Sequence, residues 1–164
     1  LIIHNSSIEY NLNLPENFTL INKKNYGHGW GGWKFGLNSV NTNNYDYFCL
    51  IKDKTTLFSH NSNYKINWIE NCINLIKNNV IMISYEINLM RSLKSNIRFK
   101  PHCKAQFLFL NKTALDIIFE NNLFRHDVIG KREKLITEFI FNKGYNINCL
   151  KNNKNIDYLK LSKF

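Results

Sequence analysis

Two different spacings of apolar residues between positions 45 and 150 constrain the fold more than any other feature of this chain. Over 81–89, large apolar side chains stand at every second position, as in a half-buried strand. Over 66–80, they stand three or four positions apart, which predicts a helix with one apolar face. The residues of that face are Ile66, Ile69, Ile73, Ile76 and Val80. Both patterns fit within one domain, which we place at 45–150 of the 164 residues.

The rest of this domain completes an order of strands and helices. Further strands are predicted at 45–52, 105–110 and 145–149. Helical spacing begins at Thr113 and again at Lys131, and Gly144 suits a helix C-cap. With the two late helices taken as one broken helix, we expect an α+β, ferredoxin-like βαββαβ domain. Its helices would cover one face of the sheet and leave the other face open to RNA or protein.

We expect residues 1–44 to form an N-terminal extension. Apolar residues alternate over 8–14, which predicts a short strand there. Five of the seven glycines then fall among Trp30, Trp33 and Phe35. Gly27, Gly29 and Gly32 match GxGxxG, but a dinucleotide-binding fingerprint needs a strand before it and a helix after it. The following GLNSVNTNN predicts no helix. We therefore interpret this segment as a structured loop, or as a stacking surface for RNA bases or a neighbouring protein.

The positive charge of the chain is concentrated in two segments. The formal net charge is +10. Segment 91–104 contributes +5 without an acidic residue, and 143–164 contributes +4. Segment 91–104 joins two predicted strands as a long basic loop, and 151–164 predicts an extended basic C-terminal arm. A polyanion is the expected partner, with nucleic acid ahead of an anionic membrane surface, although a merely soluble basic surface has the same composition.

Several classes of function have no support in the sequence. No apolar run approaches the roughly 18 residues of a membrane helix, so we expect no membrane span. The four cysteines form no CxxC pair, and the histidines and cysteines show no metal-ligand spacing. The adjacent pairs His102–Cys103 and His126–Asp127 are the strongest enzyme candidates, but adjacency in sequence does not ensure a hydrogen bond. We expect no enzyme activity, metal, cofactor or small-molecule substrate.

The basic loop and the strand and helix after it show a resemblance to a known family. The loop holds a basic stretch and a Pro-His pair, and it is followed by Gln-Phe and by a helix that opens with Leu-Asp-Ile-Ile. The matching residues are Arg91, Lys94, Arg98, Lys100, Pro101, His102, Lys104, Gln106, Phe107, Lys112, Leu115, Asp116, Ile117 and Ile118. Because these residues stand in the same order as in that family, the chain resembles the tenth protein of the ribosomal small subunit, the S-ten family, over about 45–150. The loop tip is shorter and less basic than in that family, and Leu89 and Met90 replace its usual prolines.

The resemblance implies a structural constituent of the head of the small ribosomal subunit. Its partners would be small-subunit ribosomal RNA and neighbouring proteins of the head. The residues that it implies for RNA binding are Arg91, Lys94, Arg98, Lys100, His102, Lys104 and Lys112. The excess of Asn, Ile and Lys, with 28, 20 and 18 residues, indicates AT-rich codons. We therefore expect an organelle-encoded protein, bound to ribosomes in the mitochondrial matrix.

One alternative of a different class stays open. An accessory subunit of a mitochondrial respiratory-chain complex, encoded in the same AT-rich genome, would show the same composition. It would not account for the net charge of +5 in the single strand-to-strand connection 91–104.

Overall fold

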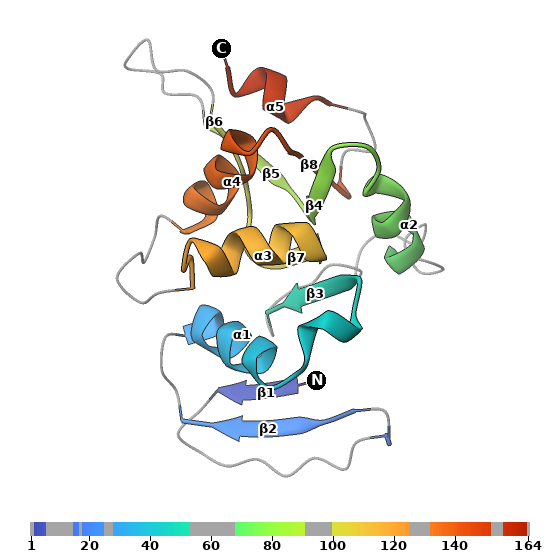
Figure 1. Cartoon of the computed structure of the whole chain (residues 1–164), viewed down its shortest axis with the longest axis vertical. Coiled ribbons are helices and arrows are strands. Elements are labelled where there is room, and N and C mark those ends of the chain that lie inside the picture. Colours follow the sequence, from blue (N-terminus) through green and yellow to red (C-terminus); the bar gives the residue numbers. More distant parts are fainter. Residues whose placement is uncertain are drawn as a thin grey trace. The chain divides into compact units, whose positions relative to one another are not determined.

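The computed structural model describes residues 2–5, 15–16, 18–24, 28–52, 68–90, 100–124, 132–151 and 156–163 (Figure 1). The chain divides into two compact units. The first unit consists of Leu1–Tyr45 and Phe124–Ile129, and the second consists of Asp46–Leu123 and Gly130–Phe164.

The first unit contains a two-stranded parallel sheet and a helix. Strands β1 (Ile2–Asn5) and β2 (Leu20–Lys23) pair in parallel, and helix α1 (His28–Asn38) packs against β1. A short 3-10 helix (Thr42–Asn44) follows, and the Asn41 side chain caps it. The strand predicted over 8–14 lies outside the described residues.

Helix α1 contains the glycine- and tryptophan-rich segment, so our interpretation of that segment as a loop is wrong. Trp30 and Leu37 are buried, and Trp33 is half-buried between them in the helical spacing i, i+3, i+7. The Trp30 ring lies 5.0 Å from the Trp33 ring and 6.0 Å from the Phe124 ring. A glycine inside a helix costs about 1 kcal/mol relative to alanine. Burial of large apolar side chains, at about 1.5–3 kcal/mol each, offsets that cost.

The second unit is built on a four-stranded sheet with the order β3-β7-β4-β8. The strands are β3 (Tyr47–Ile51), β4 (Val80–Ser84), β7 (Phe107–Asn111) and β8 (Asn146–Cys149). β7 runs antiparallel to both of its neighbours, and β8 runs parallel to β4. Helices α2 (Trp68–Leu75), α3 (Lys112–Glu120), α4 (Arg132–Asn142) and α5 (Tyr158–Leu161) complete this unit. The expected α+β class is confirmed.

Helices cover both faces of this sheet, so the expectation of one open face is wrong. On one face, Cys72 of α2 packs with Ile83, Phe107 and Phe109, and the Trp68 ring meets the Phe107 ring edge-on at 5.7 Å. The alternate residues of the same strands form the opposite face, which α3 and α4 cover. Buried residues of that face are Phe48, Leu50, Met82, Leu108 and Leu110. Buried helical residues that cover it are Leu115, Ile118, Ile136 and Ile140.

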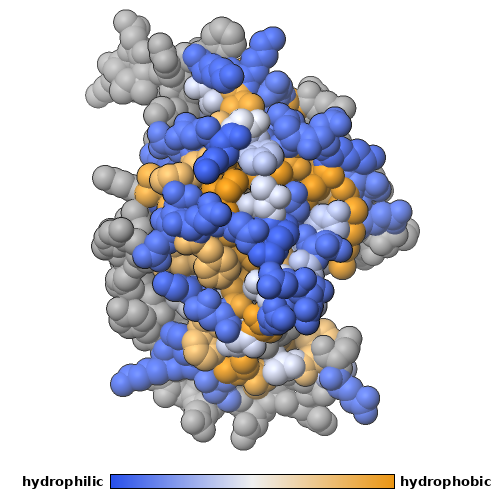
Figure 2. All heavy atoms as spheres, in the orientation of Figure 1, coloured by the Kyte–Doolittle hydropathy of each residue, from blue (hydrophilic) through white to orange (hydrophobic). Residues whose placement is uncertain are grey.

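Helix α2 turns a different side to the core from the one that the sequence predicts. Cys72 is fully buried, whereas Ile69 and Ile73 are 49% and 37% exposed. Figure 2 accordingly shows hydrophobic side chains at the surface in the region of α2. Trp68, Leu75 and Ile76 pack against the core beside Cys72. The apolar residues of the helix spread over about 160° of its circumference, so the spacing of isoleucines alone does not identify the buried side.

The predicted strand over 81–89 is two strands. β4 ends at Ser84, and β5 (Ile87–Met90) begins three residues later in a separate sheet. The Ser84 hydroxyl donates to Glu86 O at 2.6 Å and accepts from Glu86 N at 3.2 Å, which stabilises the turn between the strands. An apolar side chain at every second position continues across this turn, so the pattern does not reveal the break.

The late helices begin and end close to their predicted positions. Asn111 caps α3 by accepting from Ala114 N at 3.0 Å. At the end of α4, Gly144 has φ +83°, and Tyr145 N donates to Ile140 O at 3.1 Å. Only glycine adopts that backbone conformation without a steric cost. The predicted glycine C-cap is confirmed.

Candidate nucleic-acid interface

The expected loop over 91–104 contains a strand, which belongs to a hairpin outside the four-stranded sheet. β5 pairs antiparallel with β6 (Lys100–Cys103), in the register Ile87 with Cys103 and Met90 with Lys100. The pair of Met90 with Lys100 therefore lies at the end of the hairpin that is farther from β4. Arg91, Lys94 and Arg98 lie outside the described residues. For Lys100, the structure describes only the backbone, in the last pair of the hairpin.

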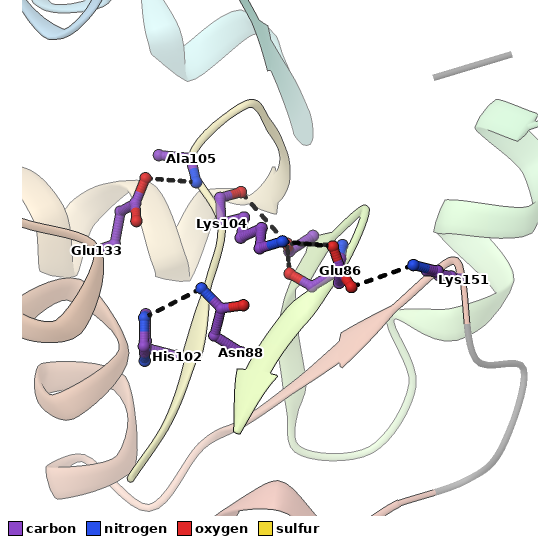
Figure 3. Close-up of polar contacts among 8 residues, drawn as sticks. Glu86, Asn88, His102, Lys104, Ala105, Glu133 and Lys151 are labelled. Carbon is purple, nitrogen blue, oxygen red and sulfur yellow. Dashed lines mark hydrogen bonds and ion pairs between the residues drawn. The ribbon is translucent and has the colours of Figure 1, made fainter. Parts of the chain in front are cut away.

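The base of the hairpin is packed into the second unit through β6. His102 is 6% exposed, and its Nε2 lies 3.4 Å from Asn88 Nδ2 on β5 (Figure 3). Cys103 N donates to Thr137 Oγ1 on α4 at 3.2 Å. With so little exposed surface, the His102 side chain is placed to orient the hairpin. Its expected contact with RNA has little room in this structure.

Lys104 lies just beyond β6, in a network that connects three segments of the chain. Its ammonium is 2.6 Å from Glu86 Oε2, and Lys151 Nζ is 3.1 Å from Glu86 Oε1 (Figure 3). Lys104 N donates to Glu86 O at 3.1 Å, and Lys151 N donates to Tyr85 O at the same distance. The network therefore ties the two sides of the hairpin base to the chain that leaves β8.

The charges of this network are unbalanced in favour of the cations. Hydrogen bonds from Lys104 and then from Lys151 lower the pKa of Glu86 below its ordinary value of 4.5. The hydrogen bond to Glu86 raises the pKa of Lys151 above 10.5. Glu86 and Lys151 therefore stay charged at neutral pH. Because two ammonium groups share one carboxylate, the trio retains a net charge of +1.

Helix α4 holds the turn that carries Lys104. Glu133, in the first turn of α4, accepts from Ala105 N at 2.8 Å (Figure 3). The Thr137 hydroxyl that binds Cys103 N itself donates to Glu133 O at 2.9 Å. Two successive turns of α4 thus fix the end of β6 and the turn that follows it.

Lys112 is the predicted RNA-binding residue that the structure separates from the others. It begins α3 and forms an ion pair with Asp116, one helical turn along. β7 runs from Phe107 to Asn111, so Lys104 and Lys112 lie at opposite ends of that strand. The structure brings Lys100, His102 and Lys104 together on and just beyond β6, and it places Lys112 elsewhere.

Four residues of this region were not expected from the sequence. Ser84, Glu86, Asn88 and Glu133 all hold the hairpin base through hydrogen bonds. A pattern search for cations passes over them because each is uncharged or acidic. Glu86 and Lys104 have opposite charges and lie 18 positions apart, with Glu86 before the predicted strand-to-strand connection and Lys104 at its end. This is the one sequence signal that could have predicted their ion pair.

The enzyme candidates gain nothing from the geometry. His102 faces Asn88, and burial raises the pKa of the Cys103 thiol, which keeps that sulfur protonated. His126 and Asp127 lie outside the described residues. Within the described ranges, no three His, Cys, Asp or Glu side chains gather in a metal-binding arrangement. The described helices include none that is long and apolar enough to span a membrane.

Comparison with known proteins identifies no relative, since no family model, no curated protein and no solved structure matches this chain.

The pH dependence of stability tests the carboxylate of this network. A pKa lowered by folding contributes stability above the group's ordinary value, and that stability is lost as the pH falls through the folded-state value. We expect Glu86→Gln to lower the free energy of unfolding by about 0.5–1 kcal/mol at pH 7, as for a partly exposed ion pair. Urea unfolding at pH 7 and at pH 3 measures the difference, which should shrink at pH 3. An equal difference at both values would contradict a role for this charge.

Proposed function

We propose that this protein is a structural constituent of the small ribosomal subunit of a mitochondrion and that it binds ribosomal RNA through the β5–β6 hairpin. The observation that carries the proposal is the position of the basic segment 91–104. Its residues Lys100–Cys103 form one strand of a hairpin outside the main sheet, and the segment contains five cations and no acid. A cationic segment of this kind suits contact with a phosphate backbone, whose counterions it releases on binding.

The support at the hairpin base fits this function. Lys104 and Lys151 share Glu86, and Glu133 and Thr137 of α4 hold the end of β6. A hairpin that enters a crowded ribonucleoprotein needs such an anchor, because ordering a loose loop on binding costs conformational entropy. Neighbouring proteins of the subunit head are the proposed additional partners.

Kinship with the S-ten family belongs to the same proposal. Without the β5–β6 hairpin, the strands of the main sheet and the helices between them follow the order βαββααβ, which supports a ferredoxin-like arrangement, and so does the placement of β7 between β3 and β4. Two features depart from the expected arrangement: α2 lies on the opposite face from α3 and α4, and β8 lies beside β4 and parallel to it.

Sedimentation of mitochondrial lysates tests the proposed location. The full chain, carrying an epitope tag, should sediment with small ribosomal subunits at low salt. It should leave them after RNase treatment or at high salt, because phosphate contacts weaken steeply with ionic strength. Migration with inner-membrane complexes in detergent, unaffected by RNase, would instead favour the respiratory-chain alternative.

A further inference from the structure

The C-terminal segment is docked beside the hairpin, although we expected an extended arm. Helix α5 packs against β6 and β8 (Figure 1). Tyr158, at its first position, is 2% exposed, and its hydroxyl lies 3.7 Å from Cys149 Sγ. Asn146 donates from Nδ2 to Asp157 Oδ1 at 2.9 Å and accepts from Leu159 N at 3.0 Å. One buried ring and two hydrogen bonds thus fix this segment in place.

This docking places the described parts of the two basic segments beside each other in the second unit. The hairpin base and the segment after β8 meet at Glu86, and α5 lies against β6. The described lysines in these elements are Lys100, Lys104, Lys151, Lys160 and Lys163. The side chains of Lys151, Lys160 and Lys163 are exposed to solvent.

The acidic residues among these elements are already engaged within the fold. Glu86 binds two lysines, and Asp157 caps α5 by accepting from Lys160 N at 3.0 Å while it also binds Asn146. Among the described residues of these elements, five lysines against two acids give a net charge of +3. The carboxylates therefore organise the surface and leave the cations in excess.

We propose that the hairpin and the docked C-terminal segment form one continuous RNA-binding surface, in which Lys160 and Lys163 of the C-terminal segment contact the same phosphate backbone as the hairpin. This inference rests on the proposed function and adds a second contact region to it. The hairpin positions the RNA, and the C-terminal segment lengthens the contact with the backbone. A lysine used in this way recognises charge and not sequence, so the contact is sequence-independent.

The salt dependence of RNA binding tests the inference. The full chain is titrated with a labelled RNA duplex of arbitrary sequence between 50 and 200 mM KCl. Each phosphate contact that is removed should lower the slope of log affinity against log salt by about one. We expect Lys160→Ala with Lys163→Ala to lower the slope by about two and the affinity at low salt by about tenfold.

A matched variant of equal charge controls for net charge alone. Lys77 and Lys143 are exposed, and they precede β4 and β8 at the end of the sheet opposite Ser84 and Cys149. Replacing both with alanine should leave the slope within about half a unit of the wild-type value, because under this proposal neither lysine contacts the phosphate backbone of the RNA. Tyr158→Ala, which releases α5 but keeps every lysine, should also reduce binding. Circular dichroism verifies that each variant keeps its fold.

Three results would overturn the inference, and they differ in what they imply. If the variant with Lys160→Ala and Lys163→Ala has the same salt slope as the control while hairpin variants lose affinity, the inference fails and the proposed function stands. If the wild-type chain shows no salt-dependent RNA binding, both fail. If it binds vesicles containing phosphatidylserine more tightly than RNA, the surface belongs to a membrane and both fail again.

Discussion

Replacing Cys72 with aspartate is expected to unfold the second unit. Cys72 is fully buried in the cluster formed by Ile83, Phe107, Phe109 and Leu150. Burial alone raises the pKa of its thiol to about 12, so this position already disfavours a charge. An unpaired carboxylate there costs several kcal/mol, whether it stays charged or takes up a proton. That cost consumes much of the 5–15 kcal/mol that stabilises a typical domain.

Neighbouring positions on the same helix supply the control for this prediction. Ile73→Asp introduces the same side chain one residue away, at a position that is 37% exposed. Ile69→Asp does so in the first turn of α2, where the helix dipole favours a carboxylate. Each should cost no more than about 1–2 kcal/mol, since the charge stays in water. Thermal unfolding measures all three, and equal losses at 72 and 73 would contradict the orientation of α2.

The elements that the sequence predicts well are those whose local signals agree with their tertiary surroundings. The expected helix from Lys131 to Asn142 is α4, which begins at Arg132, and the predicted strand over 105–110 contains most of β7. Gly144 ends α4 as expected because a positive φ excludes most other residues at that point. Strand β8 at Asn146–Cys149 follows directly from this turn.

The wrong predictions concern choices that neighbouring segments decide. In α2, the residue buried in the core is Cys72 and not one of the neighbouring isoleucines. Cys72 is small and lies between Trp68 and Ile76, which pack against the same core. In α1, a face of large side chains outweighs four glycines whose local preference is against a helix. The two-sided covering of the sheet depends on where each crossover passes, which residue periodicity does not encode.

The site shows the same division between local and long-range information. The concentration of cations at 91–104 is visible in the sequence, but the pairing of β5 with β6 was not expected, because we interpreted the whole segment as a loop. The burial of His102 was not expected, because nothing in a Pro-His pair indicates that α4 lies against it. The convergence of Lys104 and Lys151 on Glu86 joins positions 65 residues apart, beyond the reach of any local pattern.

Reversing the charge of Arg91, Lys94 and Arg98 together is expected to remove most RNA binding. The triple change to glutamate removes three cations from a segment of +5 and adds three anions. The slope of log affinity against log salt should fall by about three, and the affinity at low salt should fall by at least about 100-fold. In cells, the variant should accumulate outside small subunits. The measurement is the same titration with labelled RNA duplex, accompanied by sedimentation of mitochondrial lysates.

The fold should survive this change, and that is what makes the experiment decisive. The three residues fall between Met90 and Lys100 in the sequence, whereas the described core and the Glu86 network are formed by other residues. Lys24→Glu, Lys77→Glu and Lys143→Glu together change the net charge equally at exposed positions outside the hairpin. If that control loses as much affinity as the hairpin variant, general charge attraction explains the binding. If only the hairpin variant loses affinity, with the thermal unfolding midpoint unchanged, the hairpin is the element that contacts RNA.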